Sequence, residues 1–384
     1  MIHASAAVRC RAMDTTTQPP VSHLIGADKG VVDTPALFVD LDILEANIAR
    51  IAGACRKGGI SWRPHTKGIK VPQIARMLIA GGAAGITCAK LGEAEVMAVH
   101  GFSDILIANQ IVGPQKIARL TALRRSCDVM VAVDSRENVA AIAEAARAAA
   151  ITIRLVIEVD MGMKRAGVEP GEACVALAHF ITQQSGVEFA GLMGWEGQTA
   201  GIADAKEKAT AVSAAVKGIV ETAEMCRKAS LPVEIVSCGG TGTYWITAAQ
   251  PGITEIQAGG GVFCDVHYAK DFAVAHPYAL TVMTTVTSRP TPNRIICDAG
   301  KKTMSSDAST PEPLGLGKVR SARLSAEHGT IELESASDTP RVGDRLEWVV
   351  GYSDTTVHLH EEIYATRNGR IAAVWPILGR GKIR

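Results

Sequence analysis

The chain has 384 residues, of which 47% are hydrophobic and 21% charged, and its formal net charge is only +1. This balance argues against nucleic acid or an anionic membrane surface as the main partner, because both usually require a strongly basic face. No segment approaches the roughly 20 apolar residues that a membrane-spanning helix needs. We therefore expect a soluble protein that acts on a small molecule.

The chain begins with a stretch rich in Ser, Thr and Pro that contains no continuous apolar segment, so a secretory signal is not expected. We predict a flexible tail over residues 1–32, with Met1 and Met13 as alternative starts. Nine cysteines are dispersed along the chain without a CxxC pair. Such dispersed cysteines are typical of buried, reduced thiols in a cytoplasmic protein.

A large domain is predicted over residues 33–270, where short apolar runs alternate with helical patterns. The runs are apolar on both faces, which indicates parallel strands covered by helices. After a first strand at 36–40, the predicted strands are 60–64, 84–89, 104–108, 129–134, 152–160, 187–194, 233–240 and 254–260. Eight such units over roughly 200–250 residues predict an α/β fold, a closed (β/α)8 TIM-like barrel, with an open doubly wound sheet as the alternative.

The pattern of residue types changes over residues 271–384. Here β-branched, alternating segments are separated by Gly, Pro, Asn and Asp, as in "GTIELES" and "DRLEWVVG". This pattern predicts a C-terminal antiparallel β domain, and "RNGR" at 367–370 predicts a hairpin turn. The first strand, 36–40, is a candidate member of this second domain.

Function in a (β/α)8 barrel gathers where the strands end. His65 and Lys67 follow the first barrel strand, Arg165 follows the strand at 152–160, and Trp195 follows the strand at 187–194. We expect these side chains to meet at one mouth of the barrel.

Two glycine clusters, at 239–242 and 259–261, follow the last two barrel strands. Bare backbone N–H groups at this position of a barrel commonly hold a phosphate, and Thr241 can add a hydroxyl. Simple turns with positive φ are the alternative for a single cluster. Two clusters on adjacent strand ends favour the phosphate site.

A phosphate site opposite Lys67 suggests pyridoxal 5'-phosphate, which needs a lysine amine for its aldehyde and a cradle for its phosphate. A lysine by itself is usually a solvated surface charge. The combination of lysine and cradle favours the cofactor over the surface charge.

Four motifs carry a resemblance to a known family: "RPHTK" (63–67), "MGWEGQ" (193–198), "SCGGTGTYW" (237–245) and the segment from "GYSDTTVHLHEE" to "GRGK". Together they resemble the D-threonine aldolase and D-serine dehydratase family, which are fold-type III pyridoxal-phosphate enzymes with an alanine racemase-like barrel and a β domain. The resemblance covers nearly the whole chain from about residue 33.

The resemblance implies a role for each matching position. Lys67 would carry the cofactor, His65 would be an active-site histidine, and Arg165 would lie near the cofactor ring. Trp195 stands where the family usually has a tyrosine. The phosphate cradle would be formed by Thr241, Gly242, Gly259 and Gly260.

The resemblance breaks at the metal motif of the family, a His-x-Asp or His-x-Cys pair that binds manganese-like ions or zinc. In this chain the same register reads Tyr352-Ser353-Asp354. Asp354 remains as an uncertain ligand of a divalent metal (Mn, Mg or Zn), and His358 or His360 could supply a rearranged one. The alternative is that "TVHLHEE" is an ordinary strand with histidines on its polar face.

By resemblance, the chain would cleave D-β-hydroxy amino acids such as D-threonine to glycine and an aldehyde. Asp354 with a metal, Tyr352 as a phenolate, or His65 would take the hydroxyl proton. The alternatives are a D-serine dehydratase-like reaction, a racemase that uses Lys67 and Tyr352, and a non-catalytic carrier of the cofactor. The family also implies a homodimer whose subunits complete each other's sites.

Overall fold

Eight parallel strands form a barrel in which the strand order follows the chain. The order in the sheet is β2-β9-β8-β7-β6-β5-β4-β3. The computed structural model describes residues 21–384. The strands are β2 (Ser61–Trp62), β3 (Ile86–Cys88), β4 (Asp104–Gln110), β5 (Asp128–Val133), β6 (Ile153–Val159), β7 (Val187–Gly194), β8 (Ile235–Cys238) and β9 (Glu255–Ile256). Each lies within a strand predicted from the sequence or overlaps it closely.

The ring closes between β2 and β3, which stand at the two ends of that order. His65, just beyond β2, forms a parallel bridge with Thr87 of β3. The backbone N–H of Thr66 donates to the carbonyl of Thr87 at 2.7 Å, and the N–H of Thr87 donates to the carbonyl of Pro64 at 2.9 Å. These bonds confirm the predicted (β/α)8 barrel and exclude the open sheet.

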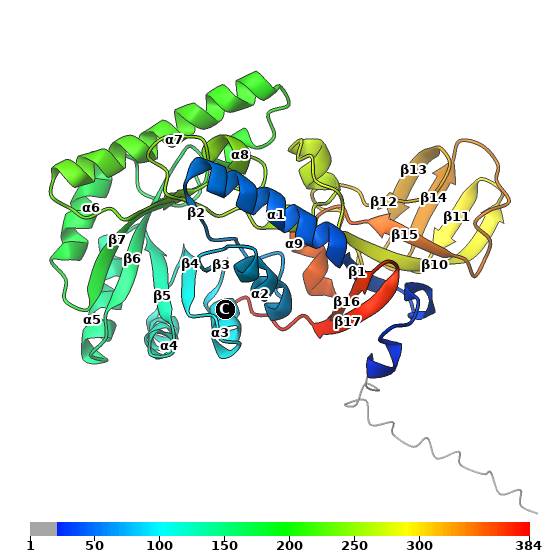
Figure 1. Cartoon of the computed structure of the whole chain (residues 1–384), viewed down its shortest axis with the longest axis horizontal. Coiled ribbons are helices and arrows are strands. Elements are labelled where there is room, and N and C mark those ends of the chain that lie inside the picture. The colour runs from blue at the N-terminus through cyan, green and yellow to red at the C-terminus, as the bar shows by residue number, and fades with distance from the viewer. Residues whose placement is uncertain (1–20) are drawn as a thin grey trace, which may run out of the picture.

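Helices cover the outside of the barrel, as Figure 1 shows. They are α1 (Leu41–Gly58), α2 (Pro72–Ala80), α3 (Leu91–Val99), α4 (Pro114–Arg124), α5 (Arg136–Ala148), α6 (Glu172–Thr182), α7 (Ala205–Lys228) and the short α8 (Tyr244–Thr247). Ser135 caps α5 by accepting the N–H of Asn138, as its position before the helical pattern predicts. Among the described residues no helix is both long and apolar enough to span a membrane.

A second sheet of nine strands forms the β domain. Its main path runs β13-β14-β11-β10-β1-β16-β17, and β15 pairs with β10 and β12. The strands are β1 (Ala36–Asp40), β10 (Leu280–Thr291), β11 (Arg294–Cys297), β12 (Glu312–Pro313), β13 (Val319–Leu324), β14 (Gly329–Leu333), β15 (Arg345–Val349), β16 (Glu362–Arg367) and β17 (Arg370–Pro376). The hairpin at 367–370 is confirmed, since Asn368 and Gly369 both have positive φ, 49° and 73°.

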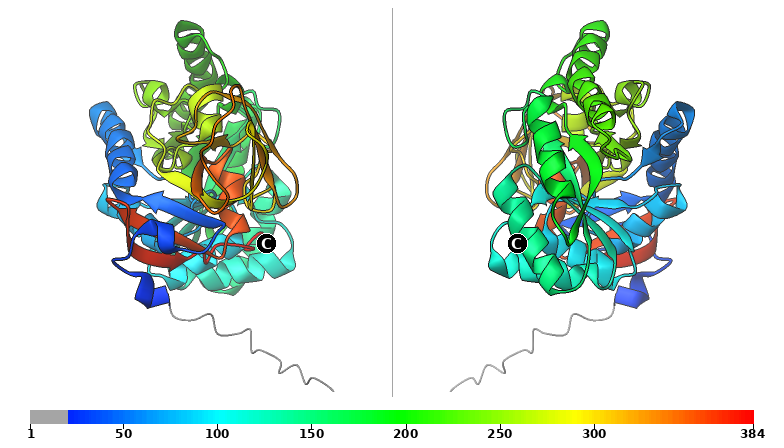
Figure 2. Two further views of the ribbon diagram at one scale, coloured as in Figure 1. Left: turned by 90° about the vertical axis from the view of Figure 1, so that its right-hand side faces the viewer. Right: turned by 90° about the vertical axis from the view of Figure 1, so that its left-hand side faces the viewer.

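Strand β1 belongs to this second sheet although it precedes the barrel. Phe38 pairs with Thr281 of β10 in antiparallel register and with Tyr364 of β16 in parallel register. Figure 1 shows β1 beside β16 and β17, away from the barrel strands. The sheet is therefore mixed at this one pairing and antiparallel elsewhere. Figure 2 shows the molecule end-on, with the β domain in front in the left view and the barrel helices in front in the right view.

Two segments differ from the sequence predictions. Of the predicted tail, residues 1–20 lie outside the described residues, but 21–32 form the 3-10 helices η1 (Val21–Leu24) and η2 (Lys29–Val31). The N–H of Gly26 donates to the carbonyl of Ile371, which ties this segment to β17. The alternative interpretation of "TVHLHEE" (356–362) as an ordinary strand is wrong, because α9 (Ser353–Thr356) and η6 (Val357–Leu359) occupy most of this segment.

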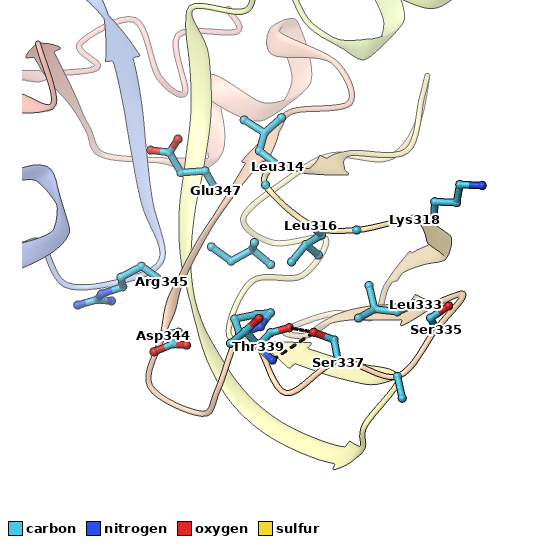
Figure 3. Close-up of a pocket in the computed structure, with 15 residues that line it drawn as sticks. Leu314, Leu316, Lys318, Leu333, Ser335, Ser337, Thr339, Asp344, Arg345 and Glu347 are labelled. Carbon is cyan, nitrogen blue, oxygen red and sulfur yellow. Dashed lines mark hydrogen bonds between the residues drawn. The ribbon is translucent and has the colours of Figure 1, made fainter.

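The β domain also contains a hollow of about 830 Å³. Figure 3 shows its lining, which combines the apolar side chains of Leu314, Leu316 and Leu333 with the polar side chains of Ser337 and Thr339. None of the side chains predicted for chemistry lines it.

Candidate active site

A cavity of about 450 Å³ lies at the carboxyl ends of the barrel strands. The β domain closes one side of it with Tyr352, which precedes α9, and Figure 1 shows α9 between the barrel and the β domain. The structure brings together in this cavity nearly all residues predicted for the site: His65, Lys67, Arg165, Trp195, Thr241, Gly242, Gly259, Gly260 and Tyr352. Asp354 does not line it but contacts Lys67. Their roles stay predictions.

Lys67 projects into the cavity from the turn after β2. Its Nζ lies 3.2 Å from Oδ2 of Asp354 and 5.7 Å from the ring centroid of Trp195. The lysine side chain is 41% exposed, whereas that of Asp354 is 10% exposed. Asp354 therefore holds the amine at the cavity wall, where it remains accessible to a small molecule.

His65 is held by the backbone around it. The N–H of Lys67 donates to its Nδ1 at 3.3 Å, and the backbone of Thr87 also interacts with the ring. Burial, together with the nearby charges of Lys67 and Lys70, holds the pKa of His65 well below its usual value. His65 is therefore neutral and positions the turn that carries Lys67.

Trp195 lies between two cations. Its ring centroid is 5.7 Å from Nζ of Lys67 and 5.6 Å from Cζ of Arg165. A Cβ at Gly240 would lie only 2.4 Å from Nε1 of Trp195, so glycine is needed there to make room for the indole. Arg165 also approaches Glu158, with 3.6 Å between Nη2 and Oε1. A delocalised cation is thus held over the aromatic wall of the cavity.

The two glycine clusters present open backbone donors to the cavity. The N–H groups of Thr241, Gly242 and Gly260 have no hydrogen-bond acceptor within residues 21–384. A Cβ at Gly259 would lie 2.0 Å from the carbonyl oxygen of His65, so this glycine lets the cradle approach the turn that carries Lys67. Unpaired N–H groups that converge on a cavity fit an anion such as phosphate.

The carboxylate of Glu196 supports the first glycine cluster, residues 239–242. Its side chain is fully buried. Oε1 accepts hydrogen bonds from the hydroxyls of Thr243 (2.7 Å) and Thr247 (2.6 Å), and Oε2 accepts one from the N–H of Gly239 (3.1 Å). Because all three donors belong to the loop after β8 and the helix α8, this carboxylate fixes the shape of the cradle.

Tyr352 and Asp354 are anchored over the cavity by the buried Asp265. Its Oδ2 accepts the N–H of Ser353 at 2.7 Å, and its Oδ1 accepts the N–H of Tyr268 at 2.8 Å. The hydroxyl of Tyr352 donates to Oδ2 of Asp354 at 3.0 Å. Burial and the charge of Asp354 hold the pKa of Tyr352 well above its usual value, so the phenol stays protonated and the proposed phenolate is disfavoured.

These donors do not fit a divalent metal. Tyr352 is neutral, and Oδ2 of Asp354 is already engaged by Lys67 and Tyr352. Only Oδ1 of Asp354 is left without a partner among the described residues, and one carboxylate oxygen is too few ligands for a metal site. His358 is exposed outside the cavity, and Nε2 of His360 is bonded to the carbonyl of Thr303. Within residues 21–384 no three His, Cys, Asp or Glu side chains gather as a metal site requires. The rearranged site with His358 or His360 is not formed.

The sequence did not predict the side of the cavity that is formed by His267, Tyr268 and Phe272. His267 and Tyr268 lie on a π-helix, η5 (His267–Asp271), and both line the cavity with Phe272. A Cβ at Gly260 would lie 2.4 Å from Oη of Tyr268, so this phenol packs against the cradle. The only signal in the sequence was two ring side chains shortly after the last glycine cluster. Single-turn π-helices occur frequently at functional sites.

The comparisons with known proteins agree with this architecture. The family described as "Alanine racemase, N-terminal domain" matches residues 39–266, and "Putative serine dehydratase domain" matches residues 279–366. The chain is 33% identical to a D-threonine aldolase of Arthrobacter sp, over 91% of this chain and 93% of that protein. It is 31% identical to a 3-hydroxy-D-aspartate aldolase of Paracoccus denitrificans, over 94% of this chain and 95% of that protein. A D-threo-3-hydroxyaspartate dehydratase of Delftia sp. is 33% identical over 75% and 77%.

A solved structure matches over the same length. The D-threonine aldolase from Filomicrobium marinum superposes with a TM-score of 0.90 at 32% identity, covering 94% of this chain and 99% of that one. The chain therefore belongs to the alanine racemase-like family that combines this barrel with a serine dehydratase-type β domain.

Proposed function

We propose that this protein is a pyridoxal-phosphate-dependent carbon–carbon lyase that cleaves D-β-hydroxy amino acids to glycine and an aldehyde. One observation carries the proposal: the exposed amine of Lys67 and the unpaired N–H groups of Thr241, Gly242 and Gly260 face one cavity. The named aldolase activities of the Arthrobacter and Paracoccus relatives support it over nearly the full chain.

The residues present would hold the cofactor at both ends. Lys67 would bind its aldehyde, and Thr241, Gly242, Gly259 and Gly260 would hold its phosphate, with Arg165 and Trp195 beside the ring. When bound, the cofactor accepts the electron pair released from the Cα–Cβ bond into its conjugated ring. The chain itself must bind the amino acid, shield the ring from water and take the β-hydroxyl proton.

A D-β-hydroxy amino acid dehydratase is the second candidate. The dehydratase of Delftia sp. supports it, as does the match of the β domain to a serine dehydratase domain. The aldolase remains the better supported function because its relatives match more of the chain and because Asp354, not cysteine, occupies the motif position. A racemase that uses Lys67 and Tyr352 is less well supported, because the alanine racemase of Clostridium difficile 630 shares only 14% identity with this chain, a likeness of fold alone.

One assay separates these functions. The purified holoenzyme is mixed with D-threonine and with 3-hydroxy-D-aspartate, and glycine with aldehyde, ammonia with oxo-acid, and the L-isomer are measured in parallel. We expect glycine and aldehyde in equal amounts. Ammonia with an oxo-acid would assign the dehydratase, and the L-isomer alone would assign the racemase. An unchanged substrate with bound cofactor would fit the non-catalytic carrier.

We further propose that the enzyme is a cytoplasmic homodimer. The eight cysteines of the described residues are all buried and unpaired, as expected in a reducing compartment. Tyr352 lines the cavity of its own subunit, so a partner would add to the wall and not supply this residue. Size-exclusion chromatography with light scattering tests the dimer, and a monomer with full activity would contradict it.

A further inference from the structure

The proposed reaction needs a group that removes the proton of the β-hydroxyl, and the structure offers few candidates. Besides Lys67, Arg165 and the buried thiol of Cys238, the titratable side chains that line the cavity are His65, Glu158, Tyr268, Tyr352 and His267. Four of the five are unsuitable as proton acceptors. Nδ1 of His65 already accepts the N–H of Lys67, and the buried ring also interacts with the backbone of Thr87.

Glu158 and the two phenols are unsuitable for different reasons. Glu158 is buried, accepts the amide of Gln110 at 2.6 Å and faces Arg165. Burial and the charge of Asp354 keep Tyr268 and Tyr352 protonated. Neither phenol can therefore act first as a proton acceptor.

His267 differs from these residues because one of its nitrogens is free. Its Nδ1 lies 2.7 Å from Oδ2 of Asp271, and a carboxylate can only accept, so Nδ1 carries the hydrogen. The second nitrogen, Nε2, points away from Asp271 and has no hydrogen-bond partner within residues 21–384. With its hydrogen on Nδ1, the imidazole presents the lone pair of Nε2, as a general base requires.

The ring is held at the cavity by its neighbours. Its centroid is 5.1 Å from the ring of Tyr352 and 4.4 Å from that of Phe272, and the side chain is 20% exposed. The N–H of His267 donates to the carbonyl of Gly351 at 3.0 Å, next to Tyr352. Asp271 also accepts the hydroxyl of Ser309, and these hydrogen bonds hold its pKa below the usual value, so the carboxylate stays charged.

We propose that His267, oriented by Asp271, is the general base that removes the β-hydroxyl proton of the substrate. This inference rests on the proposed function. The O–H bond breaks as Nε2 takes the proton, and the oxygen's electron pair forms the C=O bond of the aldehyde. The Cα–Cβ bond breaks with its pair left on the Cα side. A proton then returns to Cα to give glycine, and the imidazolium releases its proton, so the sequence is balanced without another reactant.

The test compares three variants as holoenzymes with D-threonine and 3-hydroxy-D-aspartate. For His267→Gln we expect kcat to fall about 100-fold or more, because general bases contribute factors of this order. We expect KM to change by less than about threefold, since the base acts on the transition state. In His267→Ala, added imidazole should restore part of the rate. Asp271→Asn should reduce kcat less and should not respond to imidazole. His358→Gln, an exposed histidine outside the cavity, should match the wild type.

The visible absorbance of the bound cofactor shows whether each variant keeps an intact site. If His267→Gln binds the cofactor and retains kcat within about twofold, or if imidazole does not restore His267→Ala, the inference is wrong while the proposed function stands. If His267→Gln does not fold, the Asp271→Asn variant decides, and an unchanged kcat there overturns the inference. A wild type that cleaves neither substrate overturns both.

Discussion

Nζ of Lys67 lies 3.2 Å from Oδ2 of Asp354, so the barrel and the β domain meet at the one amine that can bind an aldehyde in this cavity. The contact joins the end of the first barrel strand to the N-terminal turn of α9. It places two of the four motifs that carry the family resemblance, 63–67 and the C-terminal segment, on opposite sides of a single ion pair.

Replacement of Lys67 should abolish cofactor attachment. We expect Lys67→Ala to lack the visible absorbance of the lysine-bound cofactor after incubation with pyridoxal phosphate, because no other described amine lines the cavity. Lys90→Ala removes an exposed lysine at the end of the next strand and should leave the absorbance unchanged. A Lys67→Ala protein with the full band would assign the cofactor to another amine.

Chelation should not reduce the activity of the wild type. The neutral phenol of Tyr352 and one carboxylate oxygen that is unpaired within the described residues, Oδ1 of Asp354, do not provide a set of donors for a divalent ion. We expect equal rates before and after dialysis against EDTA. The Tyr352→His variant recreates the His-x-Asp pair and should gain Mn²⁺ binding that is measurable by calorimetry. A wild-type rate that disappears with EDTA and returns with Mn²⁺ would contradict this prediction.

Glu196 should be necessary for the cradle although it does not line the cavity. Glu196→Ala would leave the buried hydroxyls of Thr243 and Thr247 and the N–H of Gly239 without their acceptor. Each such donor costs about 1–3 kcal/mol. We expect a lower Tm and a weaker affinity for pyridoxal phosphate in titrations, with a smaller loss in Glu196→Gln. Glu188→Ala, an exposed glutamate of the same strand region, should change neither quantity.

The fold should lose stability in acid partly through His276. Its Nδ1 bonds to the carbonyl of Gly261 at 2.8 Å, and its Nε2 accepts the hydroxyl of Tyr244 at 2.9 Å. Burial lowers the pKa of His276 below the ordinary 6.5. As the pH falls, His276 therefore binds a proton at a higher pH in the unfolded chain than in the folded chain. This stabilisation is complete above the ordinary pKa and is lost as the pH falls through the lowered one.

We therefore expect the free energy of unfolding to fall less steeply between pH 7 and pH 5 in His276→Gln than in the wild type. Urea denaturation at several pH values measures this difference. The exposed His328→Gln variant serves as the control and should follow the wild-type slope. Parallel curves for His276→Gln and wild type would show that His276 does not contribute.

The sequence predicted the parts of the molecule that depend on local patterns. Apolar runs between helical segments predict the barrel strands, and Asn368-Gly369 predicts its turn because both residues tolerate positive φ. Lys67 and the glycine clusters were predicted together because barrel strands end at a common mouth, and the structure places them in one cavity.

The features that the sequence did not predict depend mainly on contacts between segments that are distant in the chain. Val357 and Leu359 alternate with polar residues as in a strand, but the anchoring of Ser353 by Asp265 begins a helical turn there. The i,i+4 spacing of His267 and Asp271 suits an ion pair on any helical turn, but no periodic apolar pattern in the sequence predicts a helix at this position, so the pair was not expected. The role of Glu196 depends on three donors that come from other segments.

The position of β1 between β10 and β16 has a consequence for biosynthesis. During translation, Phe38 emerges early, whereas its neighbours Thr281 and Tyr364 are among the last residues made. The intervening barrel can assemble first, while β1 waits with unpaired backbone groups. Until synthesis is nearly complete, the unpaired sides of β1 can therefore pair with a wrong strand. A truncated product that lacks β16 would leave one side of β1 open to aggregation.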